Sequence, residues 1–299
     1  MMFGREITWL PWQSPREPAR SPNHAPTPLS PPAETSSVDV PLREALVVLR
    51  VVLASLLVSL LWKIKGFVAA YVIYCEIPLH SDFFPHWLQD SRVVATAYVV
   101  SVVACMLAAV TRDAKFLCGQ MLIANAALAV LCLHQDSYND VTFLTCWWTS
   151  LWCTWLVSRL PHDTSAQIIN KGAFLARLIL SVIFLGGAVG KFTGGYWSGQ
   201  VLYEIYFAER QYWLFSLLRQ NFDDETLRQL ATGYSRLVIL TEACCAFLWL
   251  LPSARACSIA VAVLLGIALL SNTLLFSVLS CLMGLALVGL HRSPAAKLP

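Results

Sequence analysis

Four charged side chains lie within or at the ends of the long apolar segments of this chain: Arg50, Arg177, Lys191 and Glu242. A charge inside a membrane-spanning helix is costly and normally faces the interior of the helix bundle. A lysine held partly out of water gives up its proton more readily and can serve as a general base near neutral pH. Lys191 is therefore the candidate catalytic residue, and Arg177 and Glu242 are candidate ligand-binding residues.

These charges also have a purely structural interpretation. Glu242 can form a buried ion pair with Arg50 or Arg177 that holds two helices in register. Lys191 can instead extend its amine to the membrane surface while its methylene stem stays in the apolar layer. The sequence alone leaves both interpretations open.

Small residues surround Lys191 on both sides. Those that precede it allow the close approach of a neighbouring helix or a ligand; they are Gly186, Gly187, Ala188 and Gly190. Those that follow it turn the chain away from the apolar segment; they are Gly194, Gly195 and Gly199. Trp197 stands between them and is a further candidate ligand-binding residue.

The segment 177–199 resembles part of a known family. Its pattern begins with Arg177, and Lys191 follows fourteen residues later, directly after a group of small residues. Five more residues then lead to the Trp-x-Gly sequence that starts at Trp197. This looks like the HTTM domain, the membrane domain of vitamin K-dependent gamma-carboxylase and its bacterial relatives. Leu49-Arg50 and Glu242 are similar to family positions as well, and the resemblance extends over residues 42–290.

The resemblance implies a function. In the carboxylase, the lysine at this place is the base linked to deprotonation of vitamin K hydroquinone, so it implies Lys191 as base and a quinone or quinol as cofactor. An enzyme of this kind would be a quinol-dependent lyase or oxidoreductase. The chain ends at Pro299, without the large extramembrane domain that holds the carboxylase's protein substrate, so protein gamma-carboxylation itself is not expected.

The loop 134–140 is the second place of interest. The family carries an Asn-His pair in the corresponding loop, whereas this chain has His134 at an offset position and Asp136 near the expected one. By the order of the segments the loop shares a membrane face with Lys191. We therefore expect a cavity formed by Lys191, Asp136, Tyr138 and Trp197, unless the loop is only a solvated turn that caps the next helix.

The composition is that of a membrane protein. The 299 residues are 57% hydrophobic and 13% charged, whereas soluble domains have about 25% charged residues. Apolar runs of about 18 residues are candidate spans. The sequence predicts an all-α fold, a polytopic transmembrane helical bundle of about eight spans in the lipid bilayer: 44–62, 92–110, 116–134, 141–159, 173–191, 236–252, 254–271 and 273–290. A net charge of +3, scattered along the chain, excludes a nucleic-acid partner.

Two insertions between these segments are expected to lie at the membrane surface. The apolar piece 66–79 is too short to span comfortably and fits a re-entrant or interfacial helix. Residues 192–235 mix aromatic and charged side chains, as amphipathic interfacial helices do. The four tryptophans of the fourth segment, at positions 147, 148, 152 and 155, are interpreted as packing or lipid-facing residues rather than as a quinone or lipid platform.

The chain divides into three parts by composition. Residues 1–41 hold nine of the fifteen prolines and are predicted to be a disordered cytoplasmic tail. Residues 42–292 form the HTTM-like transmembrane domain, and 293–299 are a short tail. Eleven Lys and Arg residues fall on one side of the membrane and eight on the other, which places both termini in the cytoplasm.

Several classes of function remain. No Cys-x-x-Cys or histidine cluster indicates a metal site. The first hypothesis is a protein of the HTTM type with a non-cytoplasmic cavity for a quinone or lipid-like ligand. The alternative is a non-enzymatic membrane subunit or assembly scaffold that docks a membrane or extramembrane protein partner through its aromatic insertions. A transporter is least favoured, because no inverted repeat is visible.

Overall fold

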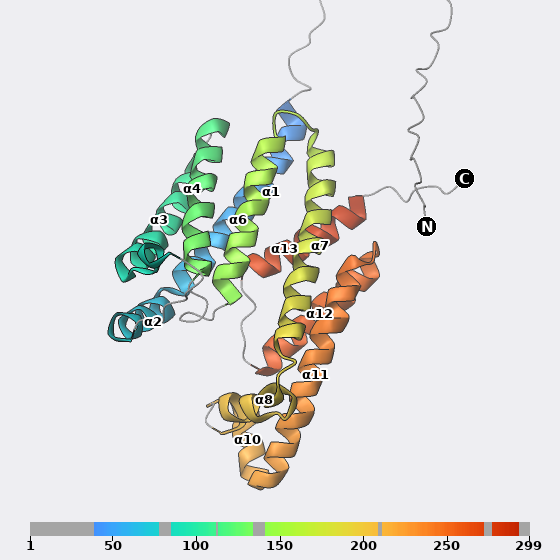
Figure 1. Ribbon diagram of the computed structural model, residues 1–299. Helices are drawn as coiled ribbons and strands as arrows, with labels where there is room; N and C mark the ends of the chain where they lie inside the picture. The colour runs from blue at the N-terminus through green and yellow to red at the C-terminus, as the bar shows by residue number, and fades with distance from the viewer. Residues whose placement is uncertain are drawn as a thin grey trace, which may run out of the picture. The chain divides into compact units, whose positions relative to one another are not determined.

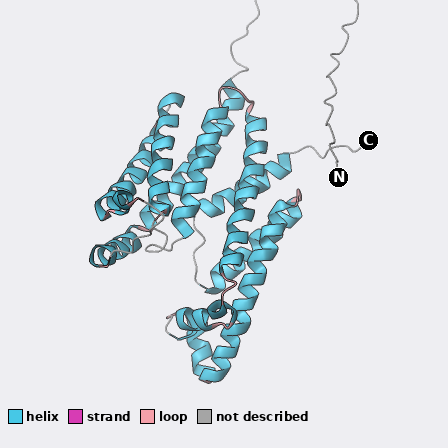
Figure 2. Cartoon of the chain, in the orientation of Figure 1, coloured by secondary structure: helices cyan, strands magenta, loops and turns pink. Residues whose placement is uncertain are grey.

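The computed structural model describes residues 39–77, 85–111, 113–133, 141–208, 211–271 and 277–292, and all their regular elements are helices (Figures 1 and 2). The predicted all-α class is confirmed. The helices are α1 (Asp39–Trp62), α2 (Ile64–Glu76), the 3₁₀ turn η1 (His86–Gln89), α3 (Ser91–Val110), α4 (Ala114–Cys132), α6 (Val141–Arg159), α7 (Ser165–Gly190), α8 (Gly194–Trp197), α9 (Gln200–Leu202), the π-helical turn η2 (Tyr203–Ala208), α10 (Trp213–Asn221), α11 (Asp224–Leu250), α12 (Ala254–Ser271) and α13 (Ser277–Arg292).

Five of these helices are long and apolar enough to cross a membrane: α1 from Glu44 onward, α3, α4, α7 and α11. The apolar parts of α12 and α13, Ala254–Gly266 and Val278–Leu290, are shorter. The protein is therefore a multi-pass membrane protein. Each of the eight predicted segments coincides with a helix, but the predicted count of eight spans is not confirmed.

The helix α1 shows why these elements suit a bilayer. Leu49, Leu53 and Leu56 are almost fully buried at helical spacing, while Val47 and Val51 on the other side are about half exposed. A helix that is apolar all round fits a membrane span, because its outer face meets lipid instead of water.

Polar caps fix where several of the helices begin. The Asp90 carboxylate accepts a hydrogen bond from Arg92 N at 2.8 Å, and the Asp113 carboxylate accepts one from Phe116 N at 2.7 Å. Thr164 forms a capping box with Gln167 at the start of α7. These side chains satisfy amide groups that the first turn of a helix leaves unpaired.

The helix α6 packs against α1, α4 and α7, and it turns its hydroxyl groups toward the protein. The side chains of Thr142, Thr145 and Thr149 are completely buried, as is Ser150. Asn125 of α4 donates to Thr154 Oγ1 at 2.6 Å and accepts a hydrogen bond from Ser150. A polar seam inside the apolar layer therefore joins α4 to α6.

Small residues bring α7 close to two neighbours. A Cβ atom on Gly172 would lie 3.1 Å from Cζ2 of Trp152, whose indole nitrogen donates to the Gly172 carbonyl at 2.9 Å. A Cβ atom on Gly289 of α13 would lie 2.0 Å from Cβ of Ala173. The crossing of α7 and α13 therefore depends on the missing side chain of Gly289.

The first insertion forms α2, which has 13 residues and is not among the five candidate spans. It is anchored on α3, because the Phe67 ring stacks on Tyr98 with centroids 4.1 Å apart. Tyr74 also donates to the carbonyl of Gln89. This agrees with the prediction that this segment is too short to span.

The second insertion is shorter than predicted. The helix α11 begins at Asp224, twelve residues before the predicted segment, so the insertion ends at Asp223. The Asp223 side chain caps α11, and Asp224 and Glu225 in its first turn complement the helix dipole. Polar residues in the first three turns hid this part of α11 from a search for apolar runs.

The helices of this insertion lie against the first half of α11 (Figure 1). They share an aromatic core with it, formed by Phe207, Phe215, Leu227 and Ala231 with Tyr206 and Tyr234 around them. The predicted tails 1–41 and 293–299 lie outside the described residues, apart from the start of α1 at Asp39. The loop 134–140, with Asp136 and Tyr138, lies outside them entirely.

Candidate functional site

Lys191 and Glu242 form an ion pair between α7 and α11. The Lys191 amine lies 2.7 Å from Glu242 Oε1 and 2.6 Å from Oε2, so it contacts both carboxylate oxygens. Their side chains are only 24% and 20% exposed. Glu242 thus forms an ion pair between two helices, as the structural interpretation allowed, but its partner is Lys191 and not Arg50 or Arg177.

The glycine one turn before Lys191 makes room for this pair. A Cβ atom on Gly187 would lie 3.1 Å from Glu242 Oε2 and 3.7 Å from Lys191 Nζ. A side chain at position 187 would thus be in tight contact with the carboxylate, which would have to shift. The small residues before Lys191 serve the close approach that the sequence predicts, and α11 is the neighbour.

Aromatic side chains stand next to the pair in sequence. The rings of Phe192 and Trp197 are stacked with centroids 5.9 Å apart, and they remain 63% and 47% exposed. The Arg236 guanidinium lies 5.2 Å from the centre of the Trp197 ring. This is a cation–π arrangement, which fixes Trp197 against α11.

The turn that follows Lys191 docks on α11 through its backbone. Gly199 has φ of +80°, and a Cβ atom there would lie 2.5 Å from the backbone nitrogen of Thr232. The Thr232 hydroxyl donates to the carbonyl of Ser198 at 2.6 Å, and the Ser235 hydroxyl donates to that of Tyr196. Gly199 is therefore required both for its backbone conformation and for this close approach.

Several residues of the segment 187–199 share one structural role, which is contact with α11. Gly187, Lys191, Trp197 and Gly199 all contact α11, at Glu242, Arg236 and Thr232. Chemically, the pair offers an amine and a carboxylate in direct hydrogen-bond contact. Since about a fifth of each side chain is exposed, a polar group or a proton from outside has access to them.

Arg177 does not belong to this arrangement. It lies fourteen residues before Lys191 on the same helix, a rise of about 21 Å. Its Nε and Nη1 atoms are buried and have no hydrogen-bond partner among the described residues. The guanidinium stands 5.9 Å from the centre of the Phe174 ring and interacts with the thiol of Cys257.

Arg50 lies elsewhere again, in a pocket of about 210 Å³ that it shares with Leu46, Thr111 and Leu117. Asp136 and Tyr138 are outside the described residues, so the predicted cavity with Lys191 and Trp197 remains a prediction. Within the described part of the chain, no group of three or more His, Cys, Asp or Glu side chains is arranged to hold a metal ion.

Of the α11 side of the site, sequence reasoning found Glu242 but missed the residues that hold the turn after Lys191. Ser235 and Arg236 lie three and four residues after Thr232, and that spacing makes both of them neighbours of Thr232 on the surface of a helix. The signal was present, but α11 was predicted to begin only at residue 236. Comparison of the chain with protein families, curated proteins and solved structures finds no match.

Proposed function

We propose that this multi-pass membrane protein is of the HTTM type and binds a quinone or similar lipid-soluble ring compound beside Lys191 and Glu242. The observation that carries the proposal is the contact of the Lys191 amine with both oxygens of Glu242, at 2.7 and 2.6 Å, with both side chains mostly buried. An ion pair inside a membrane protein either fixes how two helices pack against each other or takes part in function.

The aromatic pair supplies the binding surface for the ring. Phe192 and Trp197 are stacked and about half exposed, and they lie one and six residues after Lys191. Such a platform suits a flat, apolar ring whose polar oxygen points to the ion pair. A quinol is a ligand of this kind, since its ring is apolar and its hydroxyl carries an acidic proton.

The chemistry that the pair supports is the uptake of one proton. In the ion-paired state the amine is already protonated, so the carboxylate is the free base. A quinol hydroxyl can lose its proton to the pair, which then holds an ammonium and a carboxylic acid. Lys191 acts as the immediate base if its own proton passes to Glu242 along the 2.6 Å contact.

The test is retention of quinone during mild detergent extraction, measured by mass spectrometry of the purified full-length protein. We expect the natural protein to retain it and the Lys191→Met and Glu242→Gln variants to lose it. The control is Lys65→Met, which removes an exposed lysine of α2. Repeated absence of quinone from the natural protein would contradict the proposal.

A second candidate function is a scaffold for a protein partner. Trp213 and Leu217, one turn apart on α10, are 61% and 50% exposed. Exposed apolar side chains on a surface insertion favour docking of a partner. If Trp213→Ser abolishes an association while Lys191→Met is silent, this second function replaces the first. In either case we propose that both termini lie in the cytoplasm.

A further inference from the structure

An apolar groove runs between α6 and α7, far along α7 from the pair of Lys191 and Glu242. It encloses about 330 Å³, and its lining combines three indole rings from α6 with aliphatic side chains from α7: Trp148, Trp152, Trp155, Leu178, Ile179 and Val182. Almost no polar atom contributes to the wall. Such a groove suits a hydrocarbon chain.

The groove leads into a second pocket near the start of α7, whose lining adds two polar side chains to apolar ones. Trp155 and Leu175 line both pockets, and Asn170 and Lys171 line only the second one, which encloses about 460 Å³. From Lys171 to Val182 the helix rises by about 16 Å. This is about half of a 30 Å apolar layer, which is the depth of one lipid leaflet.

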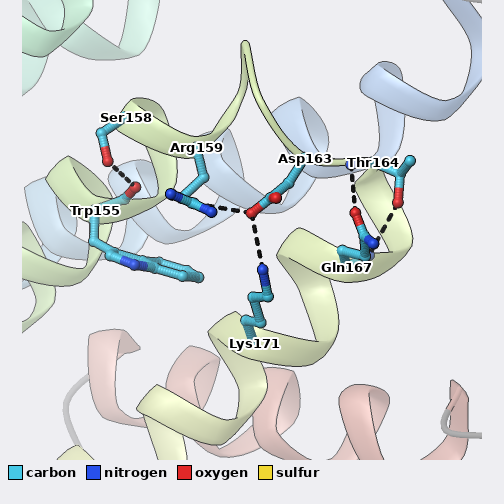
Figure 3. A network of polar contacts seen from close by, with 7 residues as sticks. All are labelled: Trp155, Ser158, Arg159, Asp163, Thr164, Gln167 and Lys171. Carbon is cyan, nitrogen blue, oxygen red and sulfur yellow. Dashed lines mark hydrogen bonds and ion pairs between the residues drawn. The ribbon is translucent and has the colours of Figure 1, made fainter. Parts of the chain in front are cut away.

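Positive charge is in excess at the polar end. Figure 3 shows the loop between α6 and α7, where Asp163 Oδ2 accepts hydrogen bonds from Arg159 Nε at 2.9 Å and from Lys171 Nζ at 3.2 Å. The Arg159 guanidinium, and Lys171 with it, keeps the pKa of Asp163 below its usual value. Two cations thus share one anion, which leaves a net charge of +1 beside the pocket.

The polar end also holds an acceptor without a donor. Asn170 Oδ1 is buried and has no hydrogen-bond partner among the described residues. Buried polar atoms are normally hydrogen-bonded. A ligand hydroxyl that donates to Asn170 would satisfy this atom, while Lys171 in the pocket lining, and Arg159 that shares Asp163 with it, would attract a phosphate.

We propose that this groove binds one anionic phospholipid with a hydroxyl-bearing headgroup. Its phosphate contacts Lys171 and Arg159, a headgroup hydroxyl donates to Asn170, and one acyl chain lies along the three tryptophans. The charge of the polar end and the apolar wall together select this occupant over a zwitterionic lipid or a second copy of the chain. On the predicted topology the site faces the cytoplasmic leaflet, where anionic lipids are found.

The experiment uses the full-length protein in nanodiscs made with equal parts of phosphatidylglycerol and phosphatidylcholine, followed by mass spectrometry of the retained lipid. We expect phosphatidylglycerol to be retained in preference. Lys171→Met removes one cation while Asp163 keeps its bond to Arg159, and it should lower this preference about fivefold. Lys115→Met, an exposed lysine at the start of α4, should leave it unchanged.

A second pair of variants tests the apolar part. Leu178→Trp fills the groove and should abolish retention of either lipid, whereas Val189→Trp adds the same ring at a position of α7 that is 63% exposed and outside the groove. Equal retention of both lipids by the natural protein would overturn the proposal. So would a quinone or a second copy of the chain found in the groove instead.

Discussion

Gly187 and Glu242 pack tightly between α7 and α11: an oxygen of the Glu242 carboxylate lies only 3.1 Å from the position that a Cβ atom on Gly187 would take. The helix contact and the ion pair with Lys191 are therefore one structural unit. A change at any of these three positions should affect the other two.

The first prediction concerns the energetic coupling of Lys191 and Glu242. Lys191→Met leaves a largely buried carboxylate without its partner, and Glu242→Leu leaves the amine alone. We expect each change to lower the free energy of unfolding by roughly 1–3 kcal/mol, and the double variant to recover most of the loss. Thermal unfolding of the three variants in one detergent measures this coupling; strictly additive losses would contradict it.

Gly199 should tolerate no side chain. Gly199→Ala adds a Cβ atom 2.5 Å from the backbone of Thr232 at a residue with φ of +80°, so both strain and overlap oppose it. We expect a loss of roughly 2–4 kcal/mol and separation of the turn 194–199 from α11.

The matched control is Gly233→Ala, one residue after Thr232 on α11. A Cβ atom there meets nothing within 4 Å, so it should leave stability unchanged or raise it by about 1 kcal/mol through helix propensity. Equal effects of the two substitutions, measured as unfolding temperatures, would argue against the docking role of Gly199.

The crossing of α7 and α13 provides a third test. Gly289→Ala places two Cβ atoms 2.0 Å apart, which requires the helices to separate, and a cost of roughly 1–3 kcal/mol follows. Ala173→Gly in the same protein removes the second atom, so the double variant should regain stability. Gly284→Ala on α13 meets nothing within 4 Å and is the control.

Asp163 predicts a dependence of stability on pH. Its pKa is lowered in the folded protein by the Arg159 guanidinium first and by Lys171 second. A lowered pKa means that the carboxylate stabilises the fold above its ordinary value of 3.8 and that this contribution is lost as the pH falls below it. The difference in unfolding temperature between the natural protein and Asp163→Asn should therefore shrink as the pH drops from 6 toward 3.

The sequence predicts α3 and α4 well because apolar length and polar caps point to the same boundaries. Asp90 and Asp113 precede the apolar runs directly and cap the helices that follow. The start of α11 was missed because polar residues fill its first turns, where Asp223 provides the cap. Helix boundaries can thus be predicted from the sequence wherever the capping residue lies next to the apolar run.

The ion-pair partner of Glu242 could not be predicted from local sequence, because the pair joins two helices that are distant in the chain. Lys191 lies 51 residues away in the sequence, and the sequence offered Arg50 and Arg177 as partners of this carboxylate but not Lys191. Only the packing of α7 on α11 decides among them, and that depends on Gly187 and on the docking of Gly199 at Thr232. Nothing in the residue types alone specifies these contacts.

The buried hydroxyl groups of α6 have a consequence for the biogenesis of the protein. This helix is not among the five that qualify as spans by their own composition, and the hydrogen bonds that Ser150 and Thr154 form with Asn125 of α4 exist only in the folded protein. Partitioning into lipid before α4 and α7 are present would expose these groups to hydrocarbon. We therefore expect α6 to enter the bilayer together with its neighbours, so that insertion and tertiary packing are a single step for this part of the chain.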